Sequence, residues 1–326
     1  MQLKPLLGQH HVSAITANAI ENYHFYTKIL GLRLVKKSIN QDDTSVYHLF
    51  YADERGNPGT DITFFEIPHA GRTYHGTNSI SLTSLRVASD EAISYWKKRF
   101  EQFTVEHDEI VTKYGRKTIA FRDVEGQRLE LVSDETNSGV VGGKPWDQSP
   151  VPVEYGIVGL GPVKLTVAKP DSTANILIDV MGYREKESYP SHNNEQPPIR
   201  VFETGEGGTG GEIYLEERAN LQRERPGRGS VHHVAFRVES EEELKKWVDY
   251  LKELRLPNSG FVERYYFRSL YFREPNGILF ELATDGPGFE GDEPFEQLGE
   301  NLSLPPYFEN QRAEIEAKLI PLDTKE

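Results

Sequence analysis

The sequence predicts an α+β fold made of four βαβββ modules that pair into two open barrels. The first observation behind this prediction is an internal repeat. Residues 113–134 and 264–285 align without a gap, and seven of the 22 aligned positions are identical. Each copy reads as a strand, a turn that contains glycine, and a second strand, with Phe, Tyr, Leu and Ile enriched in the strands. A repeat of this kind indicates one supersecondary unit that is used several times.

The second observation is that a short strand followed by an amphipathic helix occurs four times. The strands read HHVSAIT, ISLTSLRV, PVKLTVAK and HHVAFRV, and apolar residues recur at three- and four-residue spacing in the segments that follow them. A βαβββ unit leaves one face of a curved sheet uncovered, so it needs a partner unit, and four units make two barrels. The predicted modules are residues 8–68, 79–135, 158–217 and 230–286, followed by a tail over 287–326.

Local signals mark the ends of several elements. Gly31 and Gly182 follow the first and third helices, where a left-handed C-cap belongs. The Asn276-Gly277 pair is a strong hairpin signal. In the tail, a helix is predicted around 307–319.

Composition restricts the classes of function. The formal net charge is −14, which opposes binding to nucleic acid or to an anionic membrane and suits small uncharged substrates. Cysteine is absent, so disulfides, thiolate zinc sites and a cysteine nucleophile are excluded, and any metal must have nitrogen and oxygen ligands. The sequence shows neither the apolar core of a signal peptide nor an apolar run long enough to span a bilayer, so we expect a cytoplasmic protein.

Two histidine pairs are the strongest sign of chemistry. His10-His11 and His232-His233 open the first strands of the first and fourth modules, whereas the second and third modules lack histidine there. One such pair alone would be read as an exposed strand start. Its recurrence, together with Glu281 on the last strand of the fourth module, predicts a metal site with two imidazoles, one carboxylate and open positions, as in non-haem Fe(II) oxygenases. Successive strand residues face opposite ways, so one histidine of each pair should bind the metal, but the spacing does not choose which.

Two other glutamates compete for the role of metal ligand. Glu66 would be a fourth ligand and would change the chemistry, but aligning the hairpin glycines of the two modules puts Thr63 at the position of Glu281. Glu66 lies three residues further on and should face the other side of its strand, so the register argues against it while leaving it open. Glu130 is the repeat counterpart of Glu281 in a half without paired histidines, and we interpret it as structural.

Three further polar residues are predicted near the metal site. Ser13 is two residues after His11 and so shares its face. Arg264 and Tyr271 are placed on the strand that precedes the strand of Glu281. From the residues alone, Tyr271 is better explained as a core aromatic, and Arg264 as a solvated strand end.

Motifs along the whole chain resemble the ring-cleaving dioxygenases of the vicinal oxygen chelate (glyoxalase–bleomycin resistance) superfamily, in particular the branch that cleaves hydroquinones. The motifs are HHVSAIT, YHLFYADERGNPGT, VHHVAF, FELATDGPGF and LPPYFENQRAEIEAKLIPL, in matching order and at similar spacing. The resemblance implies an Fe(II) centre held by His11, His233 and Glu281, with the metal barrel formed by the first and fourth modules. Iron and manganese share such ligands, so Mn(II) stays open as the metal.

The resemblance also implies a substrate, a reaction and partners. The substrate would be a small aromatic diol, the co-substrate O₂, and the reaction a ring cleavage in quinone detoxification or aromatic catabolism. His10 and His232 would line the pocket, Arg264 and Tyr271 would stabilise oxyanions, and Ser13 stands where the best-matched relative has Thr. Homo-oligomer formation is left open.

Two other functions are compatible with the sequence. A glyoxalase-type isomerase or lyase on the same scaffold would need a fourth protein ligand, for which Glu66 is the best candidate. A non-catalytic protein that binds an aromatic compound would need the cavity but no turnover.

Overall fold

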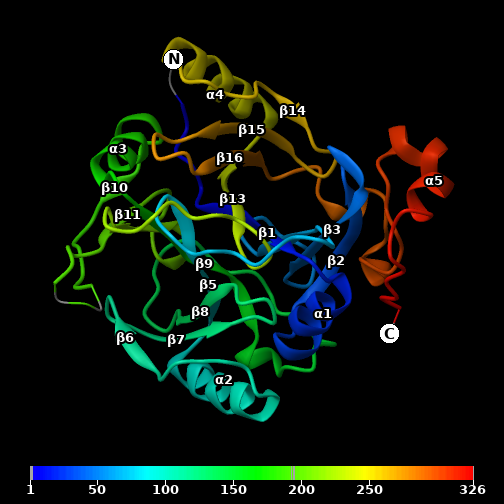
Figure 1. Ribbon diagram of the computed structural model, residues 1–326, viewed down its shortest axis with the longest axis horizontal. Coiled ribbons are helices and arrows are strands. Elements are labelled where there is room, and N and C mark those ends of the chain that lie inside the picture. The colour runs from blue at the N-terminus through cyan, green and yellow to red at the C-terminus, as the bar shows by residue number, and fades with distance from the viewer. Residues whose placement is uncertain (1–2, 192, 194, 326) are drawn as a thin grey trace.

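The strands of the molecule form two eight-stranded sheets, one from the first and last parts of the chain and one from its middle (Figure 1). The computed structural model describes residues 3–191, 193 and 195–325. In spatial order, the first sheet contains β14 (Val262–Glu263), β15 (Arg268–Arg273), β16 (Leu279–Thr284), β13 (Val231–Val238), β1 (Gln9–Thr16), β4 (Asp61–Glu66), β3 (Asp43–Ala52) and β2 (Arg33–Asn40). The second contains β10 (Arg184–Glu185), β11 (Arg200–Glu203), β12 (Glu212–Glu217), β9 (Ile157–Val167), β5 (Ser79–Val87), β8 (Arg128–Ser133), β7 (Arg116–Arg122) and β6 (Val111–Lys113).

Each sheet is built from two units that meet at its centre. In the first sheet β1 and β13 pair antiparallel, and each also pairs in parallel with the last strand of its own unit, β4 or β16. In the second sheet β5 and β9 have the same relation. The predicted pairing of the first unit with the fourth is therefore confirmed, and the architecture is the vicinal oxygen chelate fold.

Strand alternation separates the core from the inner face of the first sheet. On β1, Val12 and Ala14 are fully buried in the main apolar core. His11 and Ser13, which alternate with Val12 and Ala14 along the strand, face a cavity on the other side of the sheet. A period of two along the strand therefore places polar chemistry on one face and packing on the other.

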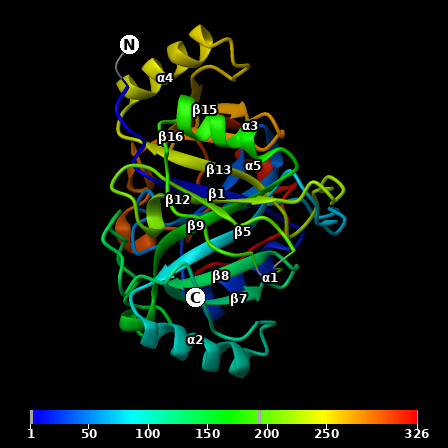
Figure 2. The ribbon, with the colours of Figure 1, turned by 90° about the vertical axis from the view of Figure 1, so that its left-hand side faces the viewer.

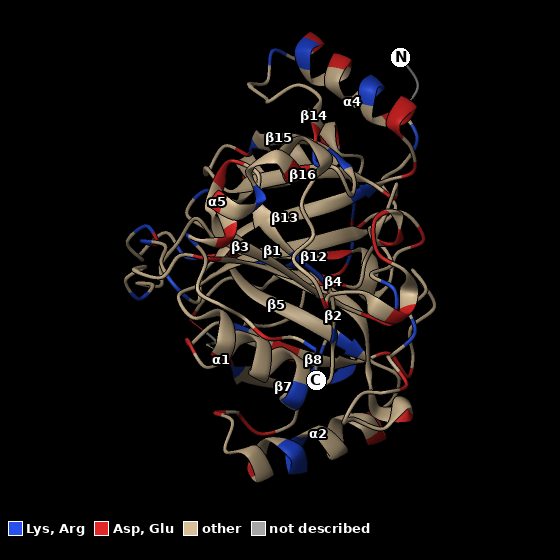
Figure 3. Ribbon diagram, turned by 90° about the vertical axis from the view of Figure 1, so that its right-hand side faces the viewer, with Lys and Arg blue, Asp and Glu red and all other residues tan. Residues whose placement is uncertain are grey.

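The helices cover the outer surfaces of the sheets. The two long helices, α2 (Asp90–Phe103) and α4 (Glu241–Glu253), lie at opposite ends of the molecule (Figures 1 and 2). Ser89 and Ser240 cap their N-termini by accepting backbone N–H bonds. Charged residues mark the helices and loops, while the central strands carry few (Figure 3). None of the helices in the described part of the chain is long and apolar enough to cross a bilayer.

The first and third predicted helices are divided in the structure. α1 (Ala19–His24) and α3 (Pro170–Asn175) each continue as a five-residue π-helical segment, Phe25–Ile29 and Ile176–Val180. A π turn differs from an α turn by one residue in its hydrogen-bond spacing, and a five-residue segment holds too few apolar positions to show that difference in the sequence. The glycines after these segments, Gly31 and Gly182, have φ values of +71° and +72°, as predicted.

The tail lies along the edge strand β2. Leu302 forms a parallel bridge with Lys37, and the Ser303 N–H donates to the Lys37 carbonyl. The predicted tail helix is shorter than expected: a 3₁₀ segment over Pro306–Gln311 leads into α5 (Arg312–Glu316).

Candidate metal centre and cavity

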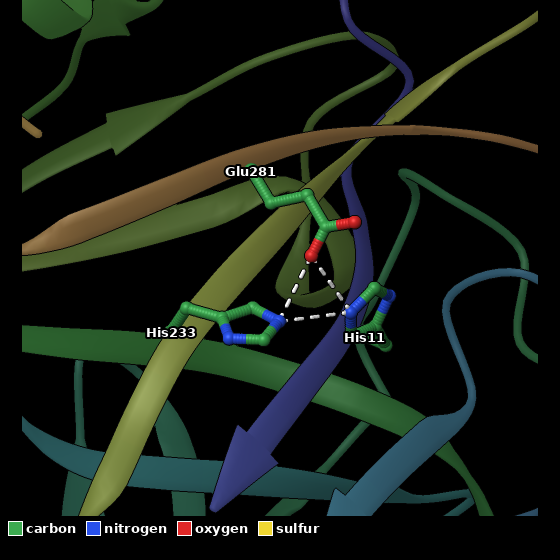
Figure 4. A group of neighbouring side chains, drawn as sticks. All are labelled: His11, His233 and Glu281. Atoms are coloured by element: carbon green, nitrogen blue, oxygen red, sulfur yellow. Dashed lines mark hydrogen bonds and ion pairs between the residues drawn. The ribbon is translucent and has the colours of Figure 1, made fainter. Parts of the chain in front are cut away.

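Three buried side chains from three strands converge at one point (Figure 4). His11 comes from β1, His233 from β13 and Glu281 from β16. Glu281 Oε2 lies 3.1 Å from His11 Nε2 and 2.8 Å from His233 Nε2, and the two imidazole nitrogens are 3.2 Å apart. Among the described residues, this is the one group of at least three His, Asp or Glu ligand atoms with metal-like spacing.

The spacing of these atoms fits a divalent metal ion. Ligand atoms about 2.1 Å from a metal lie about 3.0 Å apart at right angles and about 3.4 Å apart in a tetrahedron. The observed separations of 2.8–3.2 Å favour the right-angle arrangement, in which three protein ligands occupy one face of an octahedron. Glu281 Oε2 is fully buried and accepts no hydrogen bond, as expected for an atom placed to bind a cation.

The protonation states also suit metal binding. Burial alone would raise the pKa of Glu281, but His11 and His233 beside it hold that pKa well below its usual range. Burial lowers the pKa of His233. A carboxylate and a neutral imidazole are the forms that coordinate metals.

Neighbouring side chains orient the candidate ligands. The Ser269 hydroxyl donates to Glu281 Oε1. His10 Nε2 lies 3.0 Å from the Thr284 carbonyl oxygen, which can only accept, so the proton of the His10 ring is on Nε2. His10 Nδ1 is then free to accept a hydrogen bond from the Nδ1–H of His11, 2.9 Å away. This chain of bonds leaves the lone pair of His11 Nε2 directed at the centre.

His10 therefore differs from the expectation that it lines the pocket. Its ring is 2% exposed, and it is absent from the cavity wall. The pairing of β1 with β13 shifts register between Gln9 and His11, so His10 is the extra residue of a bulge, and its ring lies beside that of His11, against Phe267. The structure places His10 as a support for His11.

His10 should also make stability depend on pH. Burial, and then the charge of His11, lower the pKa of His10 to about 3, whereas an unfolded chain has about 6.5. Because the pKa of His10 is lower in the folded state, the unfolded chain binds more protons below pH 6.5. The contribution of neutral, buried His10 to the free energy of unfolding is therefore complete above pH 6.5 and is lost as the pH falls. At pH 5 the loss is about 2 kcal/mol. We expect His10→Gln to reduce the slope of unfolding free energy against pH between 6.5 and 5, measured by urea denaturation of metal-free protein. Equal slopes for both proteins would contradict this role.

Two of the candidate ligands, His11 and His233, line a cavity of about 410 Å³. Its volume suits a small ligand. Phe50, Phe65 and Phe267 form aromatic walls, and His232 also lines it. His232 Nδ1 lies 2.8 Å from His233 Nδ1. Desolvation, and then the neighbouring His233, lower the pKa of His232 to about 4, so the ring is neutral at pH 7.

Tyr271 and Arg264 form one polar edge of the cavity. Tyr271 on β15 pairs directly with Glu281 on β16, so the two side chains share a face. Burial raises the pKa of Tyr271, which keeps its hydroxyl protonated. Arg264 Nε donates to that hydroxyl at 3.2 Å. Arg264 lies in the turn between β14 and β15 and not on the strand predicted for it, because β15 begins only at Arg268.

A second polar edge contains a residue that the sequence analysis missed. Ser13 lines the cavity as predicted, and its hydroxyl is 2.7 Å from Thr63 Oγ1. His48 on β3 also lines the cavity, and its Nε2 is 3.0 Å from the same Thr63 oxygen. The alternation of His48 and Phe50 on a strand could have indicated a shared inner face, but only the pairing of β3 with β4 shows what His48 contacts.

The register settles where Glu66 and Thr63 lie. Ser13 pairs with Thr63 as Ala235 pairs with Glu281, so Thr63 occupies the position equivalent to Glu281, as predicted. Glu66 instead accepts the Ala19 backbone N–H at the start of α1.

In the part of the second barrel that the structure describes, no equivalent set of ligands is present. Ser84 pairs with Glu130 as Ala235 pairs with Glu281, which places Leu82 at the position of His233. Glu130 forms an ion pair with Lys113. The Glu130 carboxylate is therefore neutralised by a lysine, in contrast to Glu281, which lies beside two imidazoles.

Comparisons with known proteins agree with this architecture over the whole chain. The family model described as the glyoxalase/bleomycin resistance protein/dioxygenase superfamily matches residues 8–131 and 159–282. The chain is 54% identical over 315 residues to the Bacillus subtilis protein named "Putative ring-cleaving dioxygenase MhqA", covering 97% of this chain and 98% of the relative. It is 29% identical over 314 residues to a chlorohydroquinone/hydroquinone 1,2-dioxygenase of Sphingobium indicum, covering 94% of each.

A solved structure is similar as well. A crystal structure described as a "putative dioxygenase" from Bacillus subtilis superposes with a TM-score of 0.88 at 35% identity and covers 99% of both chains. The matched residues include both histidine pairs and Glu281. The chain therefore belongs to the glyoxalase/bleomycin resistance protein/dioxygenase superfamily.

Proposed function

We propose that the protein is an Fe(II)-dependent dioxygenase that cleaves the ring of hydroquinone- or catechol-type aromatic diols, in quinone detoxification or aromatic catabolism. The observation that carries the proposal is the group of His11, His233 and Glu281, whose two histidines line an aromatic cavity. Three protein ligands on one face leave positions for a diol and O₂. The names of the full-length relatives support this choice of reaction.

The metal and the residues of the chain would have separate roles. When bound, iron would supply the open positions and the redox chemistry that bring the diol and O₂ together. The Phe50, Phe65 and Phe267 rings would hold the flat aromatic substrate. Mn(II) could occupy the same ligands, so loading with each metal belongs in the test.

The polar edges of the cavity would manage charge and protons. Tyr271 would donate its hydroxyl proton in a hydrogen bond to a substrate oxygen that becomes negative, and the Arg264 guanidinium would stabilise the same charge. His232, neutral at pH 7 and with its Nδ1 accepting from His233, would offer its Nε2–H as a hydrogen-bond donor to an oxygen of the diol. Ser13 would offer a hydroxyl on the opposite edge.

Oxygen uptake tests the proposed function directly. Protein loaded anaerobically with Fe(II) should consume O₂ with methylhydroquinone or catechol and yield a ring-opened product by mass spectrometry. The matched control is Glu281→Gln protein treated in the same way. Full metal occupancy without oxygen uptake on any diol would reject the dioxygenase proposal. An intact diol recovered with the protein after aerobic incubation would instead favour a binding protein.

A further inference from the structure

Two turns meet at the exposed edge of the cavity. One joins β2 to β3 and contains Gln41 and Asp42, and the other joins β14 to β15 and begins with Arg264. All three residues line the cavity. The two turns come from opposite ends of the chain and from opposite edges of the eight-stranded sheet, so no backbone pairing between strands holds them together.

Side-chain bonds join the two turns instead. Arg264 Nη1 and Nη2 donate to the two carboxylate oxygens of Asp42 at 3.2 and 3.0 Å. Gln41 Nε2 donates to the Arg264 carbonyl at 2.8 Å. The Tyr307 hydroxyl, in the tail, donates to Gln41 Oε1 at 2.9 Å. The β2–β3 turn therefore holds both the side chain and the backbone of Arg264.

The guanidinium of Arg264 bonds to two partners, one exposed and one buried. Its Nη atoms face the exposed Asp42, while its Nε faces the buried hydroxyl of Tyr271. A bidentate ion pair fixes the plane of a guanidinium group, which restricts the direction of its third N–H. Loss of Asp42 would leave a long flexible side chain held by its contacts with Tyr271, the Nε bond to the hydroxyl and the stacking of the guanidinium over the ring.

The hydrogen bond from Gln41 to the Arg264 carbonyl also affects a residue deeper in the cavity. Tyr265, next to Arg264, has a φ of +66°, and the Arg264 carbonyl also accepts the Tyr266 N–H, so the turn is tight. The turn ends at Phe267, whose ring centroid lies 5.0 Å from that of His11. Fixing the Arg264 carbonyl therefore also fixes the start of the segment that packs on a candidate metal ligand.

We propose that Gln41 and Asp42 are positioning residues that latch the β14–β15 turn over the cavity and hold Arg264 in the orientation needed to bind a diol oxygen. The inference rests on the proposed function for the identity of the ligand. The ion pair with Asp42 is largely exposed, so salt should weaken it. Affinity for a diol should therefore fall with ionic strength through Asp42.

The test compares Asp42→Ala with Asp43→Ala. Asp43, the first residue of β3, is the adjacent exposed carboxylate, and it accepts hydrogen bonds from the backbone and hydroxyl of Ser45 rather than from Arg264. The readouts are the anaerobic dissociation constant of methylhydroquinone for Fe(II)-loaded protein at low and high salt, and KM and kcat for oxygen uptake. We expect Asp42→Ala to raise the dissociation constant and KM about three- to tenfold, to change kcat less, and to lose the salt dependence. Asp43→Ala should behave as wild type, and Asp42→Glu should recover part of the loss.

A second variant tests the backbone contact. Gln41→Ala should raise the same dissociation constant and speed hydrogen exchange of the amides in 264–267. If Asp42→Ala and Asp43→Ala agree within twofold in affinity and in salt response, the latch is rejected. Diol binding by wild type without oxygen uptake would reject the proposed function while leaving the latch comparison valid. No diol binding by wild type would reject both.

Discussion

Glu281→Gln is expected to abolish oxygen uptake and to remove high-affinity metal binding. The substitution keeps the shape of the side chain but replaces the carboxylate oxygen that lies 2.8–3.1 Å from both imidazoles with a neutral amide. Two neutral imidazoles then remain without the only charged ligand of the group. Changes to outer residues of metal sites typically cost roughly 10–100-fold in affinity, so loss of a ligand should exceed that. Anaerobic titration with Fe(II), followed by a chelator competition, measures the affinity.

The fold offers a matched control for this variant. Glu130 occupies the equivalent position in the second barrel, is equally buried, and is ion-paired with Lys113. Glu130→Gln should leave both Fe(II) affinity and oxygen uptake close to wild type, although it can lower stability by breaking a buried pair. Equal loss of metal binding in the two variants would mean that Glu281 acts through folding and not as a ligand.

The pairing of units could be predicted from the sequence because repeats carry long-range information. The gapless match between 113–134 and 264–285 gives the order of strands in each unit, and the histidine pairs distinguish the first and fourth units from the others. Aligning Gly59 with Gly277 puts Thr63 at the position equivalent to Glu281, and the observed register agrees. The sequence does not show which histidine of each pair is the ligand, because strand alternation indicates only that adjacent side chains point in different directions. Family resemblance selected His11 and His233, and the structure brings their Nε2 atoms together.

The remaining parts of the site depend on contacts between distant segments. His48 contacts Thr63 through the pairing of β3 with β4. Asp42 reaches Arg264 across 222 positions of sequence. None of these contacts follows from a periodicity, because each depends on how two turns or strands are placed by the curvature of the sheet.

Thr63 is the residue that distinguishes a three-ligand site from a four-ligand site on this scaffold. It is fully buried, faces the cavity side of β4, and is related to Glu281 by the approximate two-fold relation between β1 and β13. A hydroxyl there binds Ser13 and His48 and adds no negative charge. A carboxylate at the same position would extend from β4 toward the candidate metal centre and would fill a place that the diol or O₂ would need.

Thr63→Glu is therefore expected to separate metal binding from oxygen chemistry. Fe(II) affinity should stay equal to wild type or rise, because an additional anionic ligand is present, while oxygen uptake should fall by at least about a hundredfold, or about 2.7 kcal/mol of transition-state stabilisation. Thr63→Val is the matched control: it removes the same hydrogen bonds to Ser13 and His48 without supplying a ligand, so its loss should be smaller. Undiminished oxygen uptake by Thr63→Glu with bound iron would show that the fourth position is not used by substrate. If Thr63→Glu instead loses iron, the side chain does not reach the centre, and the two-fold equivalence of Thr63 and Glu281 is limited to the backbone.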